Sequence, residues 1–167
     1  MHCKRLVLCL VVFTLIALPG SLWGQDVPPA TTQAQAVAYA HAAEANPLAP
    51  EAAQQRKNAM SYMENDHTSH VLLCQSVFQE MNNDNKAHGH DVELQMIISA
   101  AAFLYEHPEA ASDSKAQNLA GINAALNVYE KFLAADPSTK FSYYEKLLKK
   151  RSEGKLEKEI ASACSSK

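Results

Sequence analysis

The chain has 167 residues, of which 47% are hydrophobic and 20% are charged, and its formal net charge is −3. This length predicts a single domain with its own core. Residues 25–139 carry 5 basic and 14 acidic side chains, whereas residues 140–167 carry 8 basic and 4 acidic ones. The acidic body argues against nucleic acid as a main partner, because binding to phosphates needs a basic surface.

The N-terminus has the pattern of a secretory signal peptide. Lys4 and Arg5 form a basic start, and residues 6–18 form an apolar stretch. This stretch is shorter than the roughly 20 residues of a membrane-spanning helix. We therefore expect residues 1–24 to be a signal peptide that is cleaved after Gly24. The mature protein would then be exported, to a periplasm or to the medium, with no stable membrane span.

Residues 25–49 are rich in Ala, Gln and Thr and contain several prolines. The part from Ala30 to Glu44 has helical propensity, but it offers few large apolar side chains to bury. We expect a low-complexity, loosely ordered segment here, followed by a helical domain over residues 50–164.

Apolar residues recur at spacings of three and four through most of residues 50–164, and no stretch alternates with the period of a strand. The pattern predicts helices over residues 51–63 and from about Ser69 to Met81. Residues 82–91 are rich in turn formers and predict a loop. A further helix, with Phe141, Tyr144, Leu147 and Leu148 on its buried face, is expected to end at Gly154. A last short helix follows over residues 156–164.

The most apolar part is a predicted helical hairpin over residues 92–137. Its second helix begins with Ser114 and Gln117 at the spacing of a capping box. Gly121 lies inside this helix, at a cost of about 1 kcal/mol relative to Ala. A close approach to the alanines at 100–102 of the first helix would explain the glycine, and a tolerated glycine is the alternative.

Residues 125–137 read ALNVYEKFLAADP. Ala125, Tyr129 and Pro137 match the small, aromatic and proline positions in the second helix of a tetratricopeptide repeat, which this segment resembles. The segment up to Leu148 matches the next repeat less well, because Glu145 stands where a glycine is expected. The resemblance implies stacked helical hairpins that bind protein without catalysis. We expect an all-α fold, with helical hairpins stacked as a small bundle or a short tetratricopeptide-like array.

Two clusters of histidine are candidate metal ligands. His67 and His70 stand near Cys74, and His88 and His90 lie in the following loop. Imidazole and thiolate are ligands of zinc and copper. The two clusters are about 18 residues apart, so the loop would have to fold back for them to share one ion.

Two cysteines, Cys74 and Cys164, remain after the predicted cleavage. Each lies on an apolar stripe, and export would permit a disulfide between them. A thiol on such a stripe also behaves as a small core residue. The sequence leaves the bonded and the free state open.

The usual short catalytic motifs are missing from the sequence. We therefore expect a non-enzymatic exported scaffold or interaction module that binds another protein and needs no cofactor. The alternative is a zinc- or copper-binding protein that uses the histidine clusters.

Overall fold

The computed structural model describes residues 26–82 and 87–165, so the predicted signal peptide lies outside the described part. Within these residues the chain forms seven α-helices, two short 3-10 helices and no strand, which confirms the predicted all-α class. The α-helices are α1 (Gln33–Ala45), α2 (Ala52–Asn65), α3 (Gln75–Asn82), α4 (Gly89–Glu106), α5 (Ser114–Ala135), α6 (Ser142–Ser152) and α7 (Leu156–Ser165). The 3-10 helices are η1 (Pro108–Ala110) and η2 (Pro137–Thr139).

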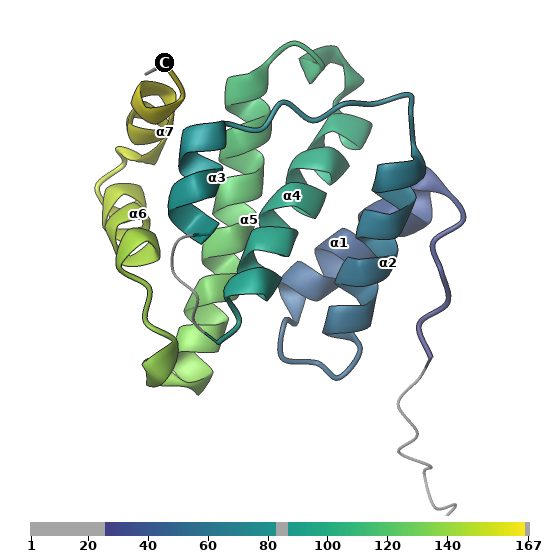
Figure 1. Cartoon of the computed structure of the whole chain (residues 1–167), viewed down its shortest axis with the longest axis horizontal. Helices are drawn as coiled ribbons and strands as arrows, with labels where there is room; N and C mark the ends of the chain where they lie inside the picture. Colours follow the sequence, from purple (N-terminus) through teal and green to yellow (C-terminus); the bar gives the residue numbers. More distant parts are fainter. Residues whose placement is uncertain (1–25, 83–86, 166–167) are drawn as a thin grey trace, which may run out of the picture.

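The predicted central hairpin is formed by α4 and α5, which lie side by side in the middle of a small bundle (Figure 1). Helices α1 and α2 pack on one side of this pair, and α3, α6 and α7 pack on the other. The larger apolar cluster joins α3 to α7 through α4 and α5, and a smaller one joins α1, α2 and α4. No helix in the described ranges is long and apolar enough to span a membrane.

Gly121 marks the closest approach of α4 and α5. A Cβ atom at this position would lie 2.5 Å from the backbone oxygen of Met96 and 3.1 Å from the Cβ of Ala100. The first distance is too short for any side chain, and its partner is helix backbone that cannot rotate away. The predicted packing reason for this glycine is therefore confirmed.

Helix α1 occupies most of the segment that we expected to be loosely ordered. Its buried side chains are Ala36, Ala40 and Ala43, which let the helix lie close to α2 and α4. The hydroxyl of Thr32 caps the first turn by accepting a hydrogen bond from the amide of Gln35. The prediction of loose order rested on the lack of large apolar side chains. It is wrong because close backbone packing buries small side chains as well.

A buried polar network holds α2 against α4. The side chain of Arg56 on α2 is 1% exposed. It donates hydrogen bonds to Gln95 at 3.2 Å and to Asp91 at 3.1 Å. Burial lowers the pKa of Arg56, and the Asp91 carboxylate opposes that shift. Gln95 in turn donates to the Ala40 carbonyl, so the network also reaches α1.

The chain between α2 and α3 is not helical, although the sequence pattern predicts a helix from about Ser69. Residues 66–74, which we call the strap, run from the end of α2 across the bundle to the start of α3 (Figure 1). Helix α3 begins only at Gln75. His67, His70 and Cys74 therefore lie in non-helical chain and do not share a helix face.

Candidate functional site

A pocket of about 270 Å³ lies where the strap meets the end of α2 and the second half of α4. Polar side chains of the strap, including Asp66, His67 and His70, stand at its rim together with Glu64. Small-molecule sites usually measure about 300–1,000 Å³, so this pocket is at the small end of that range and has room for one large side chain. Its apolar lining consists of Met60, Met63, Val71, Ile97, Ala101 and Leu104.

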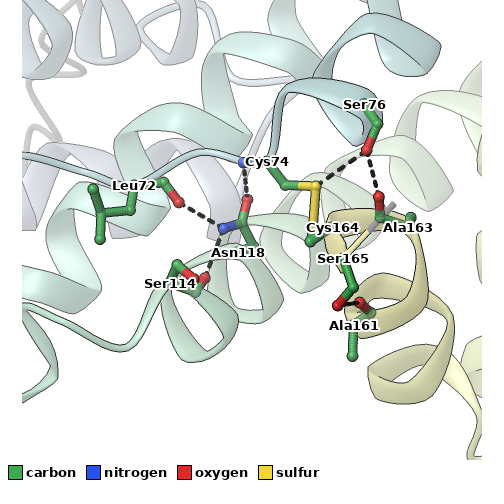
Figure 2. Close-up of a disulfide and its surroundings, with 9 residues drawn as sticks. All are labelled: Leu72, Cys74, Ser76, Ser114, Asn118, Ala161, Ala163, Cys164 and Ser165. Carbon is green, nitrogen blue, oxygen red and sulfur yellow. Dashed lines mark hydrogen bonds between the residues drawn. A yellow bond between two sulfur atoms is a disulfide. The ribbon is translucent and has the colours of Figure 1, made fainter. Parts of the chain in front are cut away.

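The strap is held in an extended form by two buried side chains of α5. The side-chain oxygen of Gln117 accepts from the Leu72 amide at 2.8 Å. Asn118 donates to the Leu72 carbonyl at 2.7 Å and accepts from the Cys74 amide at 2.8 Å, as Figure 2 shows. These bonds replace those of a helix, and they place the strap beside the pocket.

Asp66 fixes the start of the strap. Its carboxylate accepts hydrogen bonds from the amide and hydroxyl of Thr68, at 2.9 and 2.6 Å, and from the Tyr105 hydroxyl at 2.6 Å. The bonds from Thr68 and then Tyr105 lower the pKa of Asp66, because they stabilise its charged form. Burial, and then the bond to Asp66, raises the pKa of Tyr105.

Replacing Tyr105 with Phe is expected to raise the pKa of Asp66, because the carboxylate loses one donor. The folded pKa of Asp66 is below its ordinary value of 3.8. Its contribution to stability is therefore present above pH 3.8 and is lost as the pH falls through the lower folded pKa. The variant should lose less than about 1 kcal/mol at neutral pH, and this difference should vanish in strong acid.

The measurement is a carboxyl NMR titration of Asp66, combined with urea unfolding at neutral and acidic pH. Tyr62→Phe is the matched control, because the Tyr62 ring meets Tyr105 edge-on at a centroid distance of 6.5 Å without bonding Asp66. An unchanged titration of Asp66 in Tyr105→Phe would show that the hydroxyl does not stabilise the carboxylate.

The four candidate histidines do not come together. His67 and His70 are exposed at the pocket rim. His88 precedes the first residue of α4, and His90 is exposed in its first turn. The pocket borders α4 as far as Tyr105, so the two pairs lie toward opposite ends of a helix about 27 Å long.

His88 has other partners instead. Its ring stacks on Phe132 of α5 at a centroid distance of 4.0 Å, and its Nδ1 lies 3.4 Å from a carboxylate oxygen of Asp91. Across residues 26–82 and 87–165, no three side chains of His, Cys, Asp or Glu form a group that could hold a metal ion. The binding of zinc or copper by these histidines stays a prediction.

Cys74 and Cys164 form a disulfide with a Cα–Cα distance of 5.4 Å, which selects one of the two states that the sequence left open. The bond joins the end of the strap to α7 (Figure 2). The hydroxyl of Ser76 reinforces this link by donating to the Ala163 carbonyl at 2.7 Å. Helix α7 thereby stays docked over the core through Leu156 and Ile160, which are buried.

The sequence does not reveal the pocket or the residues that hold the strap. The pocket combines three segments, and its side chains on α2 appear in the sequence only as a thin apolar stripe. Gln117 and Asn118 look like ordinary polar positions near a helix start.

Asp113, and not Ser114, caps α5 by accepting from the Ala116 amide at 2.9 Å. The expected capping role of Gln117 is replaced by its bond to the strap.

No family model, curated protein or solved structure matches this chain. Ala125 and Tyr129 are buried in α5, and Pro137 begins η2. The resemblance of this segment to a tetratricopeptide repeat stays a prediction.

Proposed function

We propose that this chain is an exported, non-catalytic helical module that binds another protein, and that the strap-side pocket receives one large apolar side chain of the partner. The observation that carries the proposal is the pocket itself, which has an apolar floor and a polar rim. Interfaces between proteins commonly bury a few apolar anchors within a polar rim.

The lining of the pocket suits such an anchor. Met60 and Met63 are flexible and polarisable, so they adapt to the shape of an inserted side chain. Ile97 is half-buried and can contact the anchor directly. Burial of one large apolar side chain contributes about 1.5–3 kcal/mol, enough to account for a tenfold or larger change in affinity.

Two further features support export. The first is the signal-like N-terminus, with its basic and apolar parts. The second is the Cys74–Cys164 disulfide, since such bonds persist mainly in oxidising compartments.

The test is a selection of displayed random peptides on the mature, oxidised protein, followed by anisotropy measurements with the recovered peptides. We expect enriched peptides with a shared aromatic or large aliphatic residue. Ile97→Lys should weaken their binding about tenfold or more, because it places a charge in the pocket. The half-buried position lets the lysine reach water, so the fold should survive, and circular dichroism checks this.

Leu48→Lys is the matched control. Leu48 is 54% exposed in the loop between α1 and α2 and does not line the pocket. This variant should bind the peptides as the unmodified protein does. Failure to enrich any peptide, or equal binding by Ile97→Lys, would refute the proposal.

A further inference from the structure

Residues 69–73 of the strap alternate in burial as an edge strand does, and the alternation ends at Cys74, which is buried. Ser69, Val71 and Leu73 are half-buried, whereas His70 and Leu72 are exposed, and Leu72 is 45% exposed. Successive side chains of an extended chain point to opposite faces, so this alternation is that of a strand with one face on the bundle.

One edge of the strap is used by the fold and the other is free. The amides of Leu72 and Cys74 donate to Gln117 and Asn118 of α5. Successive amides of an extended chain point to opposite edges, so those of Val71 and Leu73 point away from these two side chains. Neither residue has a backbone hydrogen bond to the described part of the chain. Backbone N–H and C=O groups are normally paired with protein groups or with water, so we expect those of Val71 and Leu73 to be hydrogen-bonded to water in the isolated protein.

The free edge lies next to the proposed binding pocket, since Ser69, His70 and Val71 all line that pocket. An unpaired edge is a template for an added strand, and several peptide-binding domains use it in this way. A strand on this edge would have its backbone held by Val71 and Leu73 and a side chain within reach of the pocket.

The rim of the pocket is acidic. Glu64 and Asp66 are among its lining residues, and none of these lining residues is Lys or Arg. Glu64 is exposed at the pocket rim, and Glu109 is exposed just beyond the end of α4. Such a surface favours a cationic partner and opposes an anionic one.

We infer that the partner presents an extended segment rich in Lys and Arg, which adds as a strand to the free edge of the strap and places one apolar side chain in the pocket. This inference rests on the proposed function and adds the conformation and the charge of the bound segment. A helical segment would leave the backbone groups of Val71 and Leu73 unpaired. An acidic segment would be repelled by the carboxylates of the rim.

The test uses the tightest peptide from the selection and two backbone-methylated versions of it. One version carries N-methyl groups on the odd residues and the other on the even residues. A strand pairs only every second residue with one neighbour, so one version should bind about tenfold more weakly and the other should bind almost normally. The amides of Val71 and Leu73 should also exchange with solvent more slowly in the complex.

The charge of the bound segment is tested by Glu64→Lys, which should weaken binding about threefold at an ionic strength of about 0.1 M, where the screening length is about 10 Å. Glu51→Lys is the matched control, because it makes the same charge change at the other end of α2, about 20 Å away and beyond the screening length. Acidic consensus peptides, or tighter binding by Glu64→Lys, would overturn the inference.

The two levels of the proposal fail differently. Binding that survives Ile97→Lys refutes the pocket function itself. A second outcome is that Ile97→Lys abolishes binding but the two methylated peptides bind with equal affinity. This outcome supports the pocket and refutes the strand addition.

Discussion

Reduction of the Cys74–Cys164 disulfide is expected to lower the free energy of unfolding of the mature protein by about 3–4 kcal/mol, or roughly 10 °C in melting temperature. The two cysteines are 90 positions apart, so the bond restricts most of the unfolded mature chain. The bond also tethers α7, the last helix, whose main buried anchors are Leu156 and Ile160. Helix α7 should therefore loosen first.

Thermal unfolding with and without a reducing agent measures this effect, and hydrogen exchange shows whether the α7 amides open before those of α5. The double variant Cys74→Ala, Cys164→Ala is the control, because its melting temperature should not respond to the reductant. Titration of two free thiols in the unreduced, denatured mature protein would show that the bond is not formed.

Replacement of Gly121 by Ala should cost about 2–3 kcal/mol, even though Ala favours a helix by about 1 kcal/mol. The added methyl group would lie 2.5 Å from the carbonyl oxygen of Met96, so α4 and α5 would have to separate. This separation would loosen the contact on which the rest of the bundle packs. Urea unfolding measures the loss.

Gly154→Ala is the comparison for this substitution. Gly154 has a φ of 68° and no atom within 4 Å of an added Cβ, so its replacement introduces backbone strain without a clash. We expect a smaller loss of about 1 kcal/mol. Equal losses in the two variants would mean that the contact between α4 and α5 is not as tight as the structure has it.

The sequence predicts the parts of the fold that depend on local pattern. The spacing of apolar residues locates α4 and α5, and the glycine at position 121 opposite a run of alanines indicates their close contact. Both signals arise within one helical hairpin, where the partners are near in sequence. The all-α class follows from the same periodicity.

The strap shows where local pattern fails. Val71, Cys74 and Phe78 have the spacing of a helix, but Gln117 and Asn118, more than forty residues later, take the backbone groups of the strap. The candidate site could not be predicted for the same reason. Its apolar floor is assembled from α2, α4 and the strap, and the histidines that suggested a metal site end as rim and surface residues.

The most direct test of the proposed binding function is an amide chemical-shift map of the mature protein titrated with the tightest selected peptide. We expect the largest shifts at Val71, Leu73, Ile97 and Ala101, which lie along the strap and the pocket floor. The amides of α6 should remain unchanged. Largest shifts on residues 125–148, the tetratricopeptide-like segment, with none at the pocket, would contradict the assignment of the binding site.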